Sequence, residues 1–190
     1  MTIGEFKKSK INSYFACGTH PWISARFFKY KPVYKKTPYL KKLRILTNSD
    51  VKNPKFNIRL YGINEKGAPE NYIYDENIIG IAKKGKKITE VDLSKLNIEF
   101  PEKGFFTAIE WLIIEENKYE YKYTMKGSRK KIKGVSYEPA IGVIPTETNE
   151  NSWRLNKGKW SKVSGKNDNE SFKKYRNKYN QLAIELILTN

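Results

Sequence analysis

Residues 104–117 constrain the fold of this chain more than any other stretch. Side chains in an extended strand alternate between two faces, and in this stretch both faces are largely apolar. A strand of this kind belongs inside a sheet that has protein packed on each side. The exception is Glu110, whose carboxylate needs a polar or cationic partner or an open cleft, because burying an unpaired charge is costly.

The remaining chain reads as a series of short strands separated by turns. Gly, Pro, Asn and Asp recur about every ten residues, and no segment has a helical period, a combination typical of an antiparallel sandwich. Strands are expected at residues 24–30, 39–47, 55–61, 77–81, 88–93, 118–124, 132–137, 138–145 and 181–189. The sequence therefore predicts an all-β fold, an antiparallel jelly-roll-type β-sandwich with an N-terminal arm.

Two connecting segments are expected to lack regular strands. Residues 62–76 contain Asn, Gly and Pro and are predicted to form a long loop. Residues 164–180 are rich in Asn, Lys and Ser and are predicted to be a mobile loop, in which residues 171–179 have room for a helical turn or two. Residues 1–24 are predicted to form the arm or an edge strand, and residues 25–190 a single sandwich domain.

The length, the composition and the cysteine count exclude several classes of protein. A chain of 190 residues with 38% hydrophobic residues can bury a core, and no apolar run is long enough to span a bilayer. The single cysteine rules out an internal disulfide. The first ten residues lack the apolar core of a signal peptide, so a cytoplasmic location stays open.

The formal charge of +17 raises nucleic acid or another anionic polymer as a partner. Only six of the 37 basic residues are arginines, however, and both base readout and bidentate phosphate contacts favour arginine. Much of the positive charge therefore reflects a generally high lysine content. Such a charge excess indicates solubility and non-specific association before it indicates a specific function. The oligomeric state is not indicated by the sequence.

Aromatic side chains are the best candidates for a binding site. Rings in loops and hairpins can stack on a sugar or a protein partner while their polar atoms stay hydrated. The alternative is that each ring closes an open end of the sandwich, since tryptophan is highly buried on average. The candidates are Tyr119, Tyr121, Tyr123, Trp153 and Trp160.

Little in the sequence indicates catalysis, a cofactor or a metal. Cys17 and His20 supply two ligands where a structural zinc needs four, and no other Cys or His is present. Glu110 is the best candidate for acid–base chemistry. The competing interpretation is an ion pair between Glu110 and Arg59, in which case the carboxylate has a structural role.

Several motifs in order resemble a known family. They are 56–61 (FNIRLY), 91–94 (VDLS), 100–106 (FPEKGFF), 108–112 (AIEWL), 137–142 (YEPAIG), 158–160 (GKW) and 182–186 (LAIEL). This series is similar to a β-sandwich region of uncharacterised Bacteroidota proteins labelled carboxypeptidase-like regulatory-domain-containing. The resemblance implies a β-sandwich, an exported or cell-envelope location and no catalytic residues. It favours a non-catalytic binding or structural module with a glycan or envelope protein as partner.

Overall fold

The computed structural model covers residues 1–190 and describes all of them except 126, 128 and 168–172. Within these described residues, four short 3-10 helices lie among the strands: η1 (Lys8–Lys10), η2 (Pro32–Lys36), η3 (Ser94–Leu96) and η4 (Glu115–Asn117). The strands are β1 (Thr2–Ile3), β2 (Tyr14–Cys17), β3 (Ile23–Phe28), β4 (Tyr39–Asn48), β5 (Lys55–Ile63), β6 (Pro69–Ile81), β7 (Lys87–Asp92), β8 (Phe105–Trp111), β9 (Lys118–Thr124), β10 (Lys131–Thr146), β11 (Ser152–Asn156), β12 (Lys159–Lys162), β13 (Tyr179–Leu182) and β14 (Ile184–Thr189).

The strands form two antiparallel sheets with jelly-roll order. One sheet contains the run β1, β14, β4 and β7, and the other contains the run β3, β8, β5 and β6. Two sheets of four strands, between which the chain crosses repeatedly, define a jelly roll. Strands β2, β9, β10 and β13 extend the first sheet, which is called here the eight-stranded sheet. Strands β11 and β12 extend the second, called here the six-stranded sheet. The predicted fold class is confirmed.

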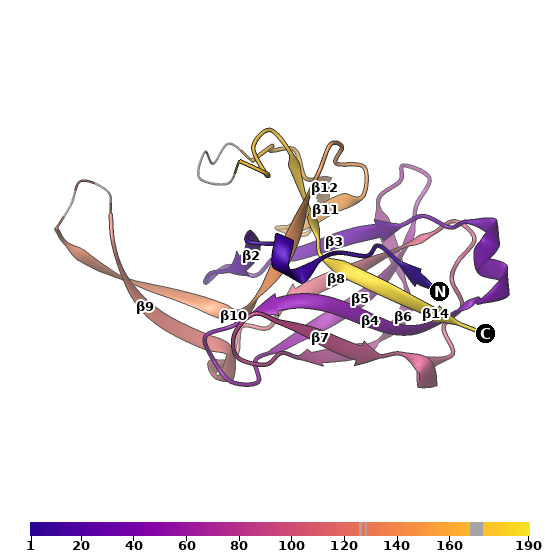
Figure 1. The fold of residues 1–190 in the computed structure, drawn as a ribbon, viewed down its shortest axis with the longest axis horizontal. Coiled ribbons are helices and arrows are strands. Elements are labelled where there is room, and N and C mark those ends of the chain that lie inside the picture. Colours follow the sequence, from indigo (N-terminus) through magenta and orange to yellow (C-terminus); the bar gives the residue numbers. More distant parts are fainter. Residues whose placement is uncertain (126, 128, 168–172) are drawn as a thin grey trace.

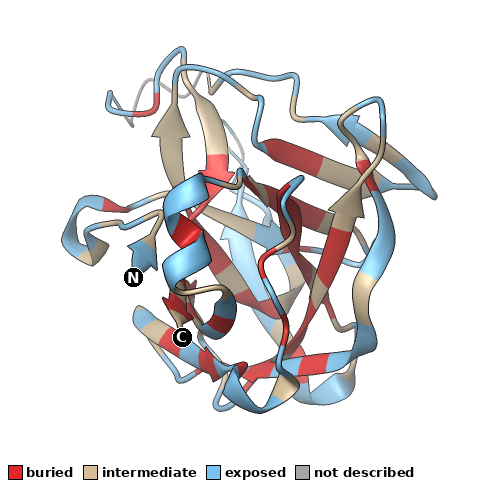
Figure 2. Ribbon diagram, turned by 90° about the vertical axis from the view of Figure 1, so that its right-hand side faces the viewer, coloured by how far each residue is buried: buried red, intermediate tan, exposed pale blue. Residues whose placement is uncertain are grey.

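The core lies between the two sheets. Phe105, Ile109 and Trp111 on β8 pack there with alternate residues of β5, β4 and β14. Buried residues follow the strands, whereas the turns are mainly exposed (Figure 2). A fully buried side chain of this size contributes about 1.5–3 kcal/mol, so this layer supplies most of the drive to fold.

Strand β8 lies between β3 and β5, inside its sheet as predicted. Its second face is also covered, because Phe106 and Ala108 pack with Ala25, Tyr61 and Trp153 in a separate apolar cluster. The strand is shorter than the apolar stretch that predicted it. It ends at Trp111, and the following residues leave the sheet and form η4.

The predicted loop at residues 62–76 is wrong over most of its length. Strand β6 begins at Pro69 and runs for 13 residues alongside β5, with irregular register near Leu60 and Tyr61. Strand β6 lies at the edge of its sheet. An edge strand tolerates polar residues and proline, so it lacks the apolar alternation by which a strand is recognised.

Strands β9 and β10 form a long hairpin that projects from the body (Figure 1). Strand β10 is continuous from Lys131 to Thr146, whereas two separate strands were expected there. Part of the predicted mobile loop, and of the predicted helical turn at 171–179, lies outside the described residues. Within the part of the chain that the structure describes, no helix has the length and apolar character needed to cross a membrane.

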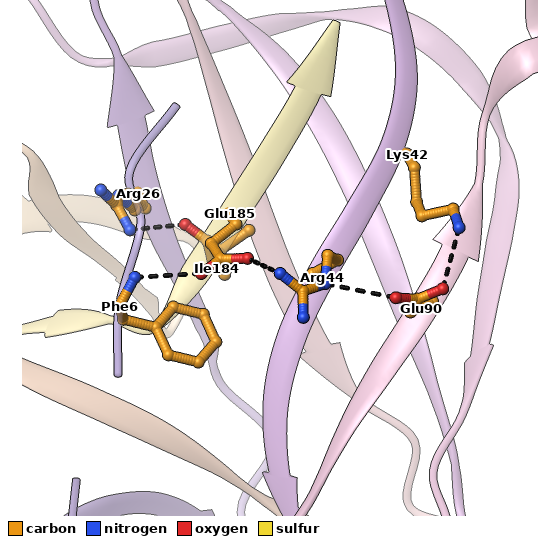
Figure 3. A network of polar contacts seen from close by, with 7 residues as sticks. All are labelled: Phe6, Arg26, Lys42, Arg44, Glu90, Ile184 and Glu185. Carbon is orange, nitrogen blue, oxygen red and sulfur yellow. Dashed lines mark hydrogen bonds and ion pairs between the residues drawn. The ribbon is translucent and has the colours of Figure 1, made fainter. Parts of the chain in front are cut away.

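The first residues are held against the eight-stranded sheet by a polar network (Figure 3). The backbone N–H of Phe6 donates to Glu185 Oε1 at 3.0 Å, and Glu185 pairs with Arg44. Arg26, buried between the sheets, donates to the carbonyl oxygen of Ile184 at 2.6 Å. Burial lowers the pKa of Arg26 to about 10, while the Glu185 carboxylate opposes that shift, so Arg26 stays charged at neutral pH.

Candidate binding surface on the six-stranded sheet

The outer face of the six-stranded sheet carries polar and aromatic side chains next to each other. On β5, Phe56, Ile58 and Leu60 point into the core. The alternate residues therefore face outward. The side chains that form this candidate site, called here the polar-aromatic surface, belong to Asn57, Arg59, Tyr61, Tyr72, Glu110 and Trp160.

Glu110 is the centre of the polar half of this surface. Its Oε2 accepts from Arg59 Nε at 3.1 Å and from Asn57 Nδ2 at 2.8 Å. The same Asn57 nitrogen donates to Asn77 Oδ1 at 3.0 Å. The predicted ion pair between Glu110 and Arg59 is confirmed. The Glu110 side chain is 32% exposed, and none of the described residues donates to its Oε1, so this oxygen can accept from a ligand.

Three rings make up the aromatic half. Tyr61 donates from its hydroxyl to the hydroxyl of Tyr72 at 3.3 Å, and Trp160 lies edge-on to Tyr61 with centroids 5.3 Å apart. Burial, together with the hydrogen bond to Tyr72, raises the pKa of Tyr61, which therefore stays protonated. Tyr72 is 48% exposed, and the Arg59 guanidinium lies 5.4 Å from its ring centroid. Tyr72 and Trp160 thus form the accessible aromatic part.

Trp153 lies beneath this surface. Its ring is buried against Phe106, with centroids 6.1 Å apart, and the Lys162 ammonium lies 5.7 Å from it. Trp153 faces Ala25 across the pairing of β11 with β3. Of the two predicted tryptophans, Trp160 is therefore partly accessible, whereas Trp153 supports it from within the apolar cluster.

The three predicted tyrosines lie elsewhere, on the projecting hairpin. Tyr119, Tyr121 and Tyr123 form a row along β9, with successive ring centroids 5.9 and 6.0 Å apart. The ring of Tyr121 covers Gly134 on β10, where a Cβ atom would lie 2.6 Å from Cζ. The hairpin also borders a hollow of about 590 Å³. It stands apart from β11 and β12 (Figure 1), so the five predicted residues fall into two groups.

The pair of Cys17 and His20 is not arranged for chemistry. Cys17 is buried, its Sγ donates to the carbonyl oxygens of Gly18 and His20, and burial raises the pKa of its thiol. A protonated thiol is a poor nucleophile and a poor metal ligand. Among residues other than 126, 128 and 168–172, no three His, Cys, Asp or Glu side chains are grouped to hold a metal.

Sequence reasoning missed Tyr72, a member of the polar-aromatic surface, and Asn77, which accepts a hydrogen bond from Asn57 of that surface. Tyr72 falls in the segment predicted to be a loop, and Asn77 lies at the start of a predicted short strand. The signal that could have found them is the sequence Tyr72-Ile73-Tyr74, because two aromatics around a β-branched residue favour a strand. Pairing of that strand with β5 then brings Tyr72 opposite Tyr61.

The fold and this surface define a jelly-roll β-sandwich with an aromatic outer face. The cysteine protease and lectin-like domains of Cwp84, a surface-layer-associated protein of Clostridium difficile, match with a TM-score of 0.55 and 14% identity, over 91% of this chain and 33% of that one. The clostridial cysteine protease Cwp84 after propeptide cleavage matches with a TM-score of 0.53 and 14% identity, over 94% and 37%.

This chain spans about a third of the length of the two structures named above. At 14% identity the likeness establishes the fold. A scan against protein-family models finds no match, and a comparison with curated proteins finds none either.

Proposed function

We propose that this chain is a non-catalytic binding module of the bacterial cell envelope that binds glycan through the polar-aromatic surface. The observation that carries the proposal is that two accessible rings, Tyr72 and Trp160, both pack on Tyr61. The Tyr72 ring also adjoins Arg59, which pairs with the carboxylate of Glu110. Sugar rings present apolar C–H faces and hydroxyl edges. An aromatic ring can cover the first, and planar polar side chains can bind the second.

The polar groups of this surface are held in place before any ligand arrives. Arg59 is fixed by Glu110 on one side and by the ring of Tyr72 on the other. Asn57 is buried, bonded to Glu110 and Asn77, and accepts from the backbone N–H of Ile78 at 3.2 Å. Fixed side chains lose little conformational entropy on binding, which favours affinity.

The distribution of carboxylates supports a non-catalytic role. Hydrolysis of a glycosidic bond ordinarily requires two carboxyl groups on either side of the bond. Glu110 is on β8 in the six-stranded sheet, whereas the buried carboxylate of Glu185 is on β14 in the eight-stranded sheet. Each carboxylate is paired with an arginine of its own sheet, Arg59 or Arg44. Both carboxylates therefore belong to ion pairs with a structural role.

Two lines of likeness support the envelope location. Cwp84 contains a lectin-like domain and is associated with a surface layer, and the sequence motifs resemble those of Bacteroidota envelope proteins. On this proposal the chain belongs to that Bacteroidota family. An envelope glycan or an envelope protein that carries glycan would be its partner.

The test is binding to a glycan array, followed by titration calorimetry with the best neutral glycan. Tyr72→Ala and Trp160→Ala are expected to lower affinity at least tenfold, about 1.4 kcal/mol. Tyr39→Ala is the matched control, because Tyr39 is an exposed tyrosine on a strand of the other sheet. Absence of glycan binding, or equal binding by Tyr72→Ala and wild type, would overturn the proposal.

A second function, binding of an anionic polymer, is favoured by the projecting hairpin. Tyr121 and Tyr123 are exposed there, and Lys122, Lys131 and Lys133 lie on the same two strands. Exposed rings flanked by cations suit single-stranded nucleic acid, because its bases can stack on the rings and its phosphates can pair with the lysines. This function predicts binding of single-stranded DNA that weakens steeply with salt and is reduced by Tyr121→Ala. Salt-independent binding, or none, would exclude it.

A further inference from the structure

A groove lies between the N-terminal arm and the hairpin of β11 and β12. It consists of two adjoining hollows of about 390 and 200 Å³, which share Phe15 and Arg154 in their lining. Trp22 and His20 border the larger hollow, and Lys162 and Asn180 border the smaller one. The residues come from opposite ends of the chain, so only the folded protein assembles this groove, called here the Arg154 groove.

Arg154 lies at the centre of the groove on a stack of aromatic rings. Its guanidinium carbon is 4.6 Å from the centroid of Trp22, which in turn stacks on Trp111 at 4.6 Å with 23° between the planes. Trp111 is anchored by a hydrogen bond of 2.8 Å from its Nε1 to the carbonyl oxygen of Pro139. A guanidinium held over a ring keeps its N–H groups available along its edge.

One donor group of the Arg154 guanidinium is unpaired in the described part of the chain. Its Nε is buried, and within the described residues it has no hydrogen-bond partner. Burial lowers the pKa of this side chain. An unsatisfied buried donor is costly, and native structures usually provide an acceptor for it. The buried Oδ1 of Asn180, which borders the smaller hollow, also lacks a partner in the described part of the chain.

The positive charge of the groove favours a negatively charged ligand as the hydrogen-bond acceptor for Arg154. Among the described residues that line the two hollows there is no Asp or Glu, whereas Arg154 and Lys162 both carry positive charge. The planar fork of an arginine matches a carboxylate, which it can bind through two parallel hydrogen bonds. Phe15 adds an apolar side to the groove, 5.8 Å from the same guanidinium. A hollow of about 390 Å³ lies in the range of small-molecule sites.

We propose that the Arg154 groove binds an acidic sugar residue, with the sugar carboxylate on the Arg154 guanidinium and the sugar ring against Phe15. The site is separate from the polar-aromatic surface and differs from it in ligand class. The Arg154 groove selects an acidic sugar through the Arg154 guanidinium. The polar-aromatic surface has Glu110 at its centre and suits a neutral sugar. Each of the two sites is therefore tested by its own experiment.

The experiment compares a uronic acid oligosaccharide with its methyl ester, by calorimetry at physiological salt. Wild type is expected to bind the acid and not the ester. Arg154→Gln should lower affinity for the acid at least tenfold. Arg154→Lys should also lower it, because a lysine keeps the charge but lacks the fork. Tyr39→Ala is the matched control and should leave binding of the acid unchanged, because Tyr39 is an exposed tyrosine on β4 and lines neither hollow.

Three results would overturn the proposal. They are equal binding of acid and ester, binding that survives Arg154→Gln, and displacement of the sugar by inorganic phosphate at equal concentration, which would show a general anion site. Thermal unfolding of each variant checks its fold. As a readout that needs no variant, the acid should raise the melting temperature of wild type and the ester should not; equal shifts would also contradict the proposal.

Discussion

Glu185 on β14 and Arg44 on β4 are direct partners across two neighbouring strands, and their side chains form an ion pair. The carboxylate is only 5% exposed, whereas the guanidinium is 32% exposed. Arg44 also donates from Nε to Glu90 Oε1 at 3.2 Å, so it connects a buried acid to an exposed one (Figure 3). The backbone N–H of Phe6 is the second donor to Glu185, which makes the N-terminal arm part of the same network.

Removing Arg44 should destabilise the fold through Glu185. Arg44→Met leaves a buried carboxylate with a single backbone donor, and we expect a loss of about 3 kcal/mol, the low end for a broken buried pair because Arg44 is partly exposed. Glu90→Gln breaks the exposed half of the network and should cost less than about 1 kcal/mol. Urea denaturation measures both. Equal losses would show that the burial of Glu185 does not govern this network.

Gly4→Ala should loosen the N-terminal arm. Gly4 has φ +75°, and an added Cβ would lie 2.6 Å from Arg26 Nη2 and 3.1 Å from the Ile184 oxygen. The strained backbone alone costs about 1–3 kcal/mol. Gly18→Ala is the control, since a Cβ there meets nothing within 4 Å. Limited proteolysis should cut the arm faster in Gly4→Ala than in Gly18→Ala; equal rates would refute the role given to Gly4.

Asn117 should be a major source of stability outside the core. It is fully buried, its Oδ1 accepts from the backbone N–H of Lys55 at 2.7 Å, and its Nδ2 donates to the carbonyl oxygens of Lys55 and Leu112. Asn117→Ala removes three hydrogen bonds at about 1 kcal/mol each. The exposed Asn71→Ala should stay within about 0.5 kcal/mol of wild type. Denaturation that shows no difference between the two variants would contradict this.

Glu138 should make stability fall with rising pH. Burial raises the pKa of its carboxyl above the ordinary 4.5, the Asp50 carboxylate raises it further, and a hydrogen bond from the Ala140 N–H opposes the rise. Between 4.5 and the raised value the unfolded chain binds fewer protons than the folded chain. The free energy of unfolding therefore decreases as pH rises through this window.

Glu138→Gln isolates this contribution, because other carboxyls such as Glu90 and Asp92 have lowered pKa values and act in the opposite direction at lower pH. The stability of wild type minus that of Glu138→Gln should shrink as pH rises from 4.5 and then level off. Denaturation at a series of pH values gives the difference. A constant or growing difference would show that burial does not raise the pKa of Glu138.

The parts of the fold that the sequence predicts are those with a strong period. Strand β8 could be placed inside a sheet because both of its faces are apolar, and the pairing of Glu110 with Arg59 follows from the cost of burying a lone charge. Strand β6 could not be predicted in full. Its position at a sheet edge leaves one side unpaired, so its residues are not required to be apolar.

The candidate sites depend on contacts between distant parts of the chain. Trp22 and Arg154 are far apart in sequence, and nothing in the local pattern of either residue indicates that one lies over the other. The division of the aromatics into the tyrosine row on β9 and Trp160 beside Tyr61 likewise follows from strand pairing. Residue type identified aromatics as candidates, and the topology decides which of them meet.

The most direct test is an NMR titration that follows the indole N–H signals of the four tryptophans, assigned with single Trp→Phe variants. Trp111 is the internal control, because its Nε1 is buried and bonded to Pro139. A neutral glycan selected on the array should shift the signal of Trp160 and leave that of Trp111 in place. A glycan that binds without moving the Trp160 signal would contradict the assignment of the polar-aromatic surface as the binding site.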